Sequence, residues 1–513
     1  MNEKGVGNLA KLLVLLLITV TTVSCVWVNR QMKMKAGGYT DVVDRTQFKV
    51  ESGPILITNV SVLSADGESM IVDQSVFLDN GEISKIAIDI PVSEMPNNLL
   101  TINGTGKFLI PGLMDGHIHL DRRANDLLLY FANGITHVRD MGGTEFMLEM
   151  REQENNGYVG PDMYIASEKF YSDPGLTGVF REWTRTRINI SKPDQVDGEI
   201  ERLAQHGYDA VKIGGFTSDE IHKALLEASK KYELAVVGHL HISKGLDGLW
   251  EGGQSELAHV EEITKAMIIE FGGYGSENAS DFLAYVNAHA DEVASKLRDH
   301  GIAVTSTIWL MESLPRQKFE LELALKEIGS NLRYVGPGNL EGTRLAKGWL
   351  PGNNSYQLPD EIESDPIAKA QSRVFWDTYV KAIHDMTSAL VRNNAVLMAG
   401  TDTGTSIVVS GFSLHDELES LAAAGLSNSE ALRSATATPG DWLNENTGRV
   451  VPSYRANLLL LNSNPLENIG STRSIEAVIK DGEFYDREQL DAMLDAVIEA
   501  NDKARSKSIY RFE

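Results

Sequence analysis

The sequence predicts an α/β fold, a (β/α)8 TIM barrel with a small β-sandwich domain built from both ends of the chain. Two observations carry this prediction. Short apolar strands alternate with amphipathic helical stretches over residues 113–445, which is the repeat and the size of such a barrel. Strand and turn signals without a helical period occupy the flanking stretches, 51–112 and 446–490, as expected of one domain assembled from two segments.

The N-terminus has the layout of an export signal. Lys4 and Lys11 come before an apolar stretch, Leu12–Val20. A small residue, Ser24, then precedes Cys25, which is the one cysteine of the chain. A basic region, an apolar core and a small residue before a cysteine are typical of a secretory signal that ends at a lipidation site. Residues 1–25 are therefore interpreted as a signal segment with lipidation at Cys25.

Two alternatives for this segment stay open. Residues 12–28 are just long enough for an uncleaved membrane anchor, and Arg30, Lys33 and Lys35 suit its flank. A plain cleaved signal is the other alternative. All three export or tether the chain, so we expect a folded part outside the cytoplasm, which is the periplasmic side if the cell is Gram-negative. Membrane contact would be through the N-terminus only, with 26–50 as a linker.

Short β-branched runs separated by turns predict the β domain. Val60–Leu63 leads to the turn at Asp66-Gly67. Near the other end of the chain, Ala456–Leu461 and Ile475–Ile479 repeat the pattern before a turn at Asp481-Gly482. Asp-Gly pairs beside such runs are hairpin signals, so the two ends are expected to share one domain.

The barrel strands are predicted where apolar runs recur between helical stretches such as Asp219–Lys231 and Asp281–Asp299. One strand precedes His117, and the other seven are Ile135–Arg139, Met163–Ala166, Ala210–Ile213, Leu234–Val237, Ser255–Val260, Ala303–Thr307 and Val396–Ala399. The segment 310–365 is too long for a plain connection and is expected to form a lid or insertion over the strand ends. Residues 491–513 are expected to form a C-terminal helix.

Composition and charge exclude several classes of function. Asp and Glu (72) outnumber Lys and Arg (47), which gives a formal net charge of −25. A surface this acidic repels phosphate backbones, so nucleic-acid binding is not expected. One cysteine allows no disulfide and no multi-thiolate metal site within the chain. With 42% hydrophobic and 23% charged residues, the chain has the composition of an ordinary globular protein.

Candidate metal ligands begin at His117-Ile118-His119. An apolar strand runs into these two imidazoles. Side chains two positions apart in a strand share a face, so both rings are expected to point into the barrel at its C-terminal end. Neutral imidazoles placed in this way suit a metal ion.

Further candidates stand at the ends of other predicted strands: Lys212, His239, His259 and Asp402. Each of them alone is more often structural. Lys212 in particular is either a lysine whose methylene groups pack along apolar surface, or a desolvated, reactive amine. With His117 and His119 they make six candidate ligands on strands 1, 4, 5, 6 and 8 of the predicted barrel. That order favours a metal centre over six unrelated structural residues.

These residues and their surroundings resemble the metal-dependent amidohydrolase superfamily, nearest its imidazolonepropionase-like and Xaa-Pro dipeptidase (prolidase-type) branch. The resemblance covers most of residues 55–490. Its motifs are IPGLMDGHIH at Ile110–His119, GITHVRDMGG at Gly134–Gly143, VVGH at Val236–His239, AGTD at Ala399–Asp402, AGLSNSEAL at Ala424–Leu432 and NPL at Asn464–Leu466.

The resemblance implies two divalent metal ions with six ligands, His117, His119, Lys212, His239, His259 and Asp402. Lys212 would carry CO₂ as N6-carboxylysine and bridge both ions, because a carbamate ligates where an ammonium cannot. Zn²⁺ is the expected metal, and Mn²⁺, Fe²⁺ and Co²⁺ suit the same ligands. A metal-bridging hydroxide would attack the scissile carbonyl, with Asp402 as the proton shuttle to the departing amine.

Other polar side chains could face an anionic group of the substrate or support the ligands, although each of them alone is more often a solvated or supporting residue. These are Arg139, His241 and His415, with Lys244 as a further positive group. His241 would share a face with His239 and either replace or support it. The VVGH motif favours His239 as the ligand.

The leading prediction is an exported hydrolase that cleaves an amide bond of a small molecule, such as a dipeptide or an N-acyl amino acid. An ester, lactone or phosphotriester hydrolase with the same metal centre is an alternative, because substrate choice lies in the loops after the strands. A non-catalytic binding protein with this fold is a further one, and the presence of all six ligands argues against it. A homo-oligomer would be in keeping with the resemblance, although the sequence indicates no interface.

Overall fold

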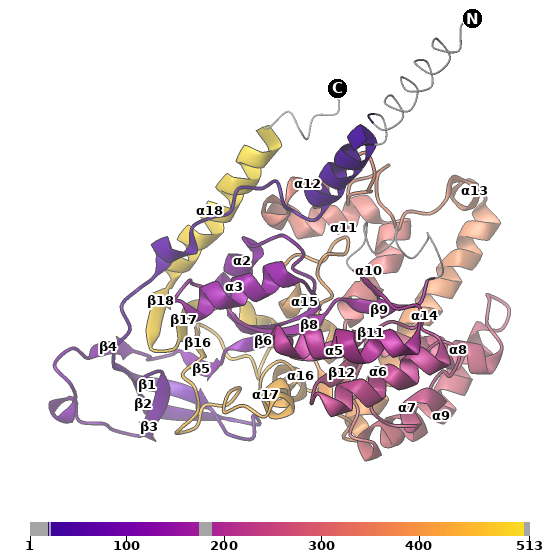
Figure 1. Ribbon diagram of the computed structural model, residues 1–513. Coiled ribbons are helices and arrows are strands. Elements are labelled where there is room, and N and C mark those ends of the chain that lie inside the picture. The colour runs from indigo at the N-terminus through magenta and orange to yellow at the C-terminus, as the bar shows by residue number, and fades with distance from the viewer. Residues whose placement is uncertain (1–18, 20–21, 174–186, 507–513) are drawn as a thin grey trace, which may run out of the picture.

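The computed structural model describes residues 19, 22–173 and 187–506 of the chain. A barrel of parallel strands surrounded by helices lies at its centre, and a separate β domain lies to one side (Figure 1). The barrel strands are β6 (Leu113–Ile118), β7 (Ile135–Gly143), β8 (Asp162–Ser167), β11 (Ala210–Ile213), β12 (Ala235–Gly238), β13 (Glu256–Ala258), β14 (Ala303–Thr305) and β15 (Leu397–Met398). Each pairs in parallel with the next in this order.

Backbone hydrogen bonds between the first and last strand regions close the barrel. The amide of Gly116 donates to the carbonyl of Ala399 at 2.8 Å, and the amide of Asp402 donates to the carbonyl of His117 at 2.7 Å. All four residues of β11 are buried, because helices cover the outside of a parallel barrel and side chains fill its inside. The predicted TIM barrel is confirmed, and its closure brings two of the predicted ligands together.

Helices connect the strands and cover the barrel: α2 (Asp126–Ala132), α3 (Glu145–Asn155), α5 (Val196–Gln205), α6 (Asp219–Lys231), α7 (Asp247–Trp250), α8 (Val260–Phe271), α9 (Ala279–Asp299), α14 (Pro366–Arg392), α15 (Ser413–Ala423), α16 (Asn428–Ser434) and α17 (Ala437–Leu443). The helix predicted over Asp219–Lys231 has these bounds in α6. It begins there because the Ser218 side chain accepts a hydrogen bond from the amide of Ile221. Acidic residues in its first turn and lysines in its last turn complement the helix dipole.

The β domain is one sheet built from both ends of the chain. Its strands are β1 (Ile55–Leu63), β2 (Met70–Asp79), β3 (Glu82–Ala87), β4 (Leu100–Asn103), β5 (Phe108–Pro111), β16 (Leu458–Leu461), β17 (Ile475–Lys480) and β18 (Glu483–Asp486). The strand order is β18-β17-β16-β5-β1-β2-β3, with β4 beside β1. β5 joins the two segments, because it pairs with β1 in parallel and with β16 antiparallel. The predicted second domain from both termini is confirmed.

The insertion expected between residues 310 and 365 contains α10 (Ile308–Phe319), α11 (Leu321–Ile328), the 3-10 helix η4 (Gly329–Tyr334), α12 (Pro337–Leu340) and α13 (Asp360–Glu363). It has a small hydrophobic core of its own, in which Leu325, Val335 and Trp349 pack with Ile407 and Val409. The last two belong to the loop that follows Asp402. The insertion therefore rests on the loop that carries one of the predicted ligands.

The N-terminal segment docks on this insertion. Residues 22–35 are helical, and Met34 is fully buried where Gly338 leaves room for its backbone. The Gln31 side chain accepts from the amide of Arg344 at 3.0 Å, and Lys35 Nζ donates to the carbonyl of Lys347 at 2.9 Å. Part of the segment predicted as a linker is thus helix held against the body of the protein.

The predicted signal or anchor falls mostly on residues 1–18 and 20–21, which lie outside the described residues. Cys25 is exposed. In the described part of the chain, every helix is too short or too polar to cross a membrane. At the other end, α18 (Arg487–Ser506) runs along the body beside α2 (Figure 1). Its Asn501 donates to the carbonyl of Tyr334 at 2.9 Å.

A buried ion-pair network joins the β domain to the barrel. Lys480 Nζ, at the end of β17, lies 2.6 Å from Glu154, 3.0 Å from Asp162 and 2.8 Å from Asp481. Its side chain is 9% exposed. Glu154 belongs to α3 and Asp162 to β8, so one cation neutralises carboxylates of both domains. These three carboxylates lie close enough for a cation site, and the lysine ammonium is that cation.

Replacing Lys480 by methionine is expected to lower the free energy of unfolding by about 3 kcal/mol, because the substitution leaves buried carboxylates without their counter-charge. Chemical denaturation of the purified protein would measure the change. Lys85→Met is the control, since Lys85 is an exposed lysine of the same domain. Equal stability of the two variants would contradict the role given to Lys480.

Candidate metal centre

The six predicted ligands meet at the C-terminal end of the barrel. His117 lies in β6 and His119 follows it, while Lys212 lies in β11. His239, His259 and Asp402 follow β12, β13 and β15. Side chains at the carboxyl ends of parallel strands converge on one face of a barrel, so five strands deliver these six residues to one place.

Asp402 is the centre of this arrangement. Its Oδ1 lies 3.3 Å from Nε2 of His119 and 3.5 Å from Nε2 of His117. Ligand atoms of His117, His259 and Asp402 all lie within 4.8 Å of one another. Burial opposes ionisation of Asp402, but the hydrogen bond from His119, together with the electrostatic interaction with the neighbouring His259 and His119 rings, holds the pKa of Asp402 well below its usual range. A carboxylate in this position stays ionised.

His239 and His259 are held at their Nδ1 atoms. His239 Nδ1 lies 3.4 Å from Glu262 Oε1, and His259 Nδ1 lies 2.8 Å from the Thr307 hydroxyl. The His259 ring lies between those of His117 and His239, with centroids 4.5 and 5.3 Å away. Burial lowers the pKa of His239 to about 4 and that of His259 to about 3. Both imidazoles are therefore neutral near pH 7 and leave Nε2 for a ligand.

Lys212 lies at the bottom of the cluster and is fully buried. Its Nζ is 3.3 Å from Nε2 of His117. Burial, with help from the ammonium of Lys169, lowers the pKa of Lys212 to about 7. A neutral amine is the form of a lysine that can react with CO₂.

The donor set fits divalent metal ions. Two ligand atoms on a tetrahedral Zn²⁺ with bonds of about 2.1 Å stand about 3.4 Å apart. The distances from Asp402 Oδ1 to the two imidazole nitrogens, 3.3 and 3.5 Å, have this length. Neutral imidazoles, one carboxylate and a lysine able to form a carbamate are ligands suited to Zn²⁺, Mn²⁺, Fe²⁺ or Co²⁺.

Comparison with known proteins agrees with this geometry. Residues 108–484 match the model of the Amidohydrolase family. The chain belongs to the amidohydrolase family. The superfamily predicted from the sequence is confirmed, and membership supports the predicted enzyme class, a hydrolase of carbon–nitrogen bonds.

Individual relatives of this amidohydrolase are distant. A 66-residue stretch is 38% identical to a 5-methylthioadenosine/S-adenosylhomocysteine deaminase of Carboxydothermus hydrogenoformans, a match that spans 13% of this chain and 15% of that protein. The solved structure of a bottromycin amidohydrolase has a TM-score of 0.65 at 19% identity, over 93% of this chain and 96% of that one. A Xaa-Pro dipeptidase with bound methionine has a TM-score of 0.59 at 17% identity, over 85% and 100%. At such identities the structures share the fold, and they include the prolidase type that the sequence predicted.

The amidohydrolase cluster sits on unusual backbone. His259, Thr307 and Asp402 have φ angles of 73°, 51° and 54°, in the left-handed region that residues other than glycine rarely adopt. These positions are where the chain leaves strands β13, β14 and β15. Such strain is found at functional sites, where the surrounding structure enforces it, and here it turns the three side chains inward.

Residues not singled out in the sequence support the ligands of this amidohydrolase. Asp115 accepts hydrogen bonds from the amide and the hydroxyl of Thr401 at 3.0 and 2.7 Å and so fixes the loop before Asp402. Glu417 accepts from the amides of Ile308 and Trp309 at 3.0 and 2.7 Å, which holds the turn that carries Thr307. Burial raises the pKa of Glu417 to about 8. Asp115 lies within the IPGLMDGHIH motif, but no role was assigned to it from the sequence, and no quoted motif contains Glu417.

Four other sequence candidates do not join the cluster. Arg139 is buried inside the barrel, where it pairs with Glu256 at 3.3 Å and packs against the Trp442 ring at 4.3 Å. His241 binds the carbonyl of Thr217 and stacks near His222. The remaining two have partners elsewhere: His415 with Asn133 and Thr472, and Lys244 with Glu251. The described contacts thus pair each of the four with residues other than the six predicted ligands, and their substrate or supporting roles stay predictions.

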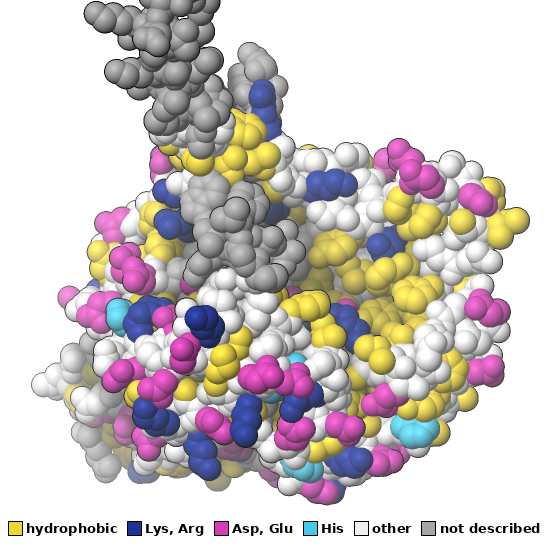
Figure 2. Space-filling view, turned by 45° about the vertical axis from the view of Figure 1, so that its right-hand side comes forward, with side chains coloured by type: hydrophobic (Ala, Val, Ile, Leu, Met, Phe, Trp, Pro, Cys, Tyr) yellow, Lys and Arg dark blue, Asp and Glu magenta, His cyan; other side chains and the backbone are white. Residues whose placement is uncertain are grey.

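The insertion borders the mouth of the amidohydrolase barrel. Burial, with Asp402 and Glu261, raises the pKa of Tyr356, which places this phenol near the cluster. Lys318 Nζ donates to the carbonyl of Tyr356 at 3.2 Å. Figure 2 shows a hollow whose walls are largely hydrophobic side chains.

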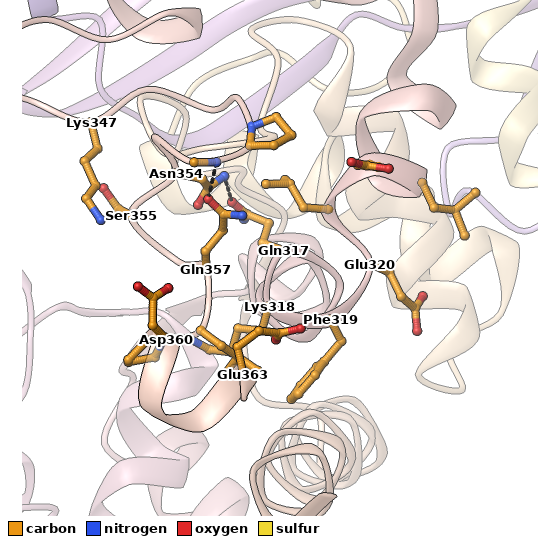
Figure 3. A pocket seen from close by; sticks show the side chains of 17 residues that line it. Gln317, Lys318, Phe319, Glu320, Lys347, Asn354, Ser355, Gln357, Asp360 and Glu363 are labelled. Carbon is orange, nitrogen blue, oxygen red and sulfur yellow. Dashed lines mark hydrogen bonds between the residues drawn. The ribbon is translucent and has the colours of Figure 1, made fainter. Parts of the chain in front are cut away.

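A cavity of about 980 Å³ lies within the insertion (Figure 3). Lys318, Lys347, Glu320 and Asp360 are among its lining residues, and none of the six ligands lines it. The Asn354 side chain donates a hydrogen bond to Gln317 at 3.0 Å, which the figure shows among the lining side chains. This cavity has charges of both signs without a convergent polar group, so its size alone assigns it no chemistry.

Proposed function

We propose that the chain is a binuclear metal-dependent hydrolase that cleaves an amide bond of a small molecule, such as a dipeptide or an N-acyl amino acid. One observation carries the proposal: five residues of types that ligate divalent metals converge with Lys212, from five strands, in one largely buried cluster. His117, His119 and Asp402 would hold one ion and His239 and His259 the other. Lys212, as N6-carboxylysine, would bridge both.

Bound there, two divalent ions would supply a water of lowered pKa and polarise the scissile carbonyl. The chain's own residues do the rest. Asp402 is ionised and lies at the mouth of the barrel, so its carboxylate accepts the proton of the attacking water and delivers it to the departing amine. Glu262 and Thr307 orient His239 and His259 through their Nδ1 atoms.

Metal content and a substrate panel test this proposal. Protein purified without chelator is expected to hold about two divalent ions per chain by elemental analysis, in keeping with a two-metal site. The panel contains dipeptides and N-acyl amino acids, together with esters, lactones and phosphotriesters as the alternative bond types. Preferential amide hydrolysis that disappears with chelation and returns with Zn²⁺ supports the proposal. Preferential ester, lactone or phosphotriester hydrolysis would reassign the bond, and folded protein without metal would overturn the metal centre.

Glu262 offers a test of one metal position. Glu262→Gln is expected to weaken binding of one of the two ions by about 10- to 100-fold, because the carboxylate that orients His239 becomes neutral. Competition with a chromophoric chelator measures this affinity. Glu270→Gln, an exposed position of the same helix α8, is the control and is expected to leave both affinities unchanged. An unaltered affinity in Glu262→Gln would remove the carboxylate from this role.

The location of the chain is a separate proposal. We propose that the chain is exported and tethered through a lipid on Cys25, which the signal-like residues 1–25 support. Mass spectrometry of the mature N-terminus tests it. A diacylglycerol on Cys25 is the expected result, whereas an intact Met1 would exclude lipidation and favour an uncleaved anchor.

A further inference from the structure

A second lysine reaches the metal centre from a strand outside the barrel sequence. β9 (Lys169–Tyr171) pairs with β10 (Arg187–Asn189) and contacts the end of β11 through Phe170 and Ile213. Lys169 Nζ lies 2.7 Å from Nε2 of His239, the nitrogen that faces the cluster. An ammonium is thus placed beside the reaction centre.

The neighbouring strand leaves room for this side chain. A Cβ atom on Gly214 would stand 3.2 Å from both Cγ and Cδ of Lys169 and 2.7 Å from the carbonyl oxygen of Phe170. The absence of a side chain at Gly214 therefore lets the lysine stem pass toward the centre. This accommodation distinguishes Lys169 from a surface lysine that happens to bend inward.

Lys169 is half-buried, and its partner differs in kind from those of three buried cations elsewhere in the described chain. Arg123, Arg139 and Lys480 each pair with a carboxylate. The Lys169 ammonium contacts the imidazole of His239. Within residues 22–173 and 187–506, it forms no ion pair with a carboxylate. When His239 Nε2 serves as a metal ligand, as proposed, its lone pair is used and Lys169 needs another acceptor.

We propose that Lys169 binds the α-carboxylate of the substrate, so that the enzyme selects amides whose nitrogen belongs to an amino acid with a free carboxylate. This inference rests on the proposed function. One carbon separates that carboxylate from the scissile amide nitrogen, which matches an ammonium set directly beside a metal ligand. A chain with a net charge of −25 repels anions, and a local cation offsets that repulsion at the point of binding.

The side chain of such an amino acid has an apolar surface to contact. Phe216 and Ile242 are 64% and 53% exposed, and they lie on the loops after β11 and β12. Phe216 stacks on Tyr171 of β9, with ring centroids 6.3 Å apart. Phenylalanine derivatives are therefore a reasonable probe for this edge of the mouth.

The test compares N-acetyl-L-phenylalanine with its primary amide as ligands of the zinc-loaded protein, with dissociation constants from calorimetry and kcat/KM where hydrolysis occurs. In the wild type the acid is expected to bind at least about tenfold more tightly than the amide, the size of one charge-assisted hydrogen bond. In Lys169→Met the ratio is expected to fall to about one, with unchanged metal content. Lys169→Arg keeps the cation and is expected to retain part of the preference.

Lys231→Met is the control for loss of a charge, because Lys231 lies at the exposed end of α6 and pairs with Asp197. Three outcomes would overturn the role of Lys169: no preference for the acid in the wild type, a preference that survives in Lys169→Met, or loss of a metal ion in that variant. The last would mean that Lys169 holds the centre together. Binding that depends on the carboxylate but occurs without hydrolysis would contradict the proposed function and support this inference. Equal hydrolysis of the acid and the amide would support the proposed function and contradict this inference.

Discussion

Asp402→Asn is expected to reduce kcat/KM by about 10³-fold or more, because under the proposed function it removes the group that transfers the proton and weakens a metal ligand at the same time. The asparagine amide neither carries the negative charge nor accepts a proton from water. The backbone should tolerate the change, since asparagine readily adopts the left-handed conformation that Asp402 has at φ 54°. Steady-state kinetics on the best substrate of the panel, at saturating Zn²⁺, would measure the loss.

Asp121→Asn is the matched control for this experiment. Asp121 has φ 52° and pairs with Arg123 outside the cluster, so the same substitution meets the same backbone without touching a ligand. We expect its kcat/KM to stay within a factor of about two or three of the wild type, as for other changes away from the chemistry. Near-wild-type activity of Asp402→Asn would show that Asp402 neither ligates metal nor carries the proton.

Lys212→Ala is expected to cost about 10³-fold in kcat/KM and to lower the metal content from two ions toward one or fewer, because the bridge between the ions supplies several kcal/mol of charge stabilisation. The alanine leaves space where a buried lysine stood. A short carboxylic acid such as propionate is expected to enter that space and restore part of the metal binding. Elemental analysis with and without propionate is the measurement.

This rescue separates ligand loss from misfolding. A variant that has only lost its fold does not recover with propionate, and circular dichroism would report the loss directly. Wild-type protein under ¹³CO₂ should show a carbamate carbon signal that is missing in Lys212→Ala. If the wild type held about one metal ion per chain and Lys212→Ala held the same amount, the centre would be mononuclear. Lys212 would then have only a packing role.

The barrel and its six candidate ligands were accessible from the sequence for one physical reason. In a parallel barrel every strand is a short apolar run, and residues just after such runs lie on the same rim. His117, Lys212 and Asp402 stand at that point in three separate runs, so their convergence needed no knowledge of loops. The helix Asp219–Lys231 was equally accessible, because its caps and charges are local.

His241 shows where that reasoning ends. Alternation of side chains holds only while the strand continues, and β12 ends at Gly238, where φ is 124°. Beyond it the chain turns, so His239 faces the cluster while His241 points to the carbonyl of Thr217. The alternation of side chains predicted that both histidines share one face. The prediction was made because the sequence does not show at which residue the strand ends.

The partners of the ligands were beyond prediction for a different reason. Glu262 and Thr307 reach His239 and His259 from a helix and from another strand end, contacts that no spacing in the sequence encodes. Lys169 stands in a three-residue strand inside a connection, too short for a periodic signal. Such residues become visible only when the fold brings distant segments together.

The sheet of the β domain contains strands from both ends of the chain, so it can be completed only after the C-terminal segment has been synthesised. β5 has β1 on one side and β16 on the other, and about 350 residues of chain separate β5 from β16, a long closure for any folding step. Until the C-terminal segment emerges, the N-terminal strands have an open edge, which is prone to pairing with other chains. Late completion of the sheet is therefore expected to delay folding of the nascent chain until the C-terminal segment has emerged. It also means that truncation before residue 458 would leave an aggregating product and not a smaller working barrel.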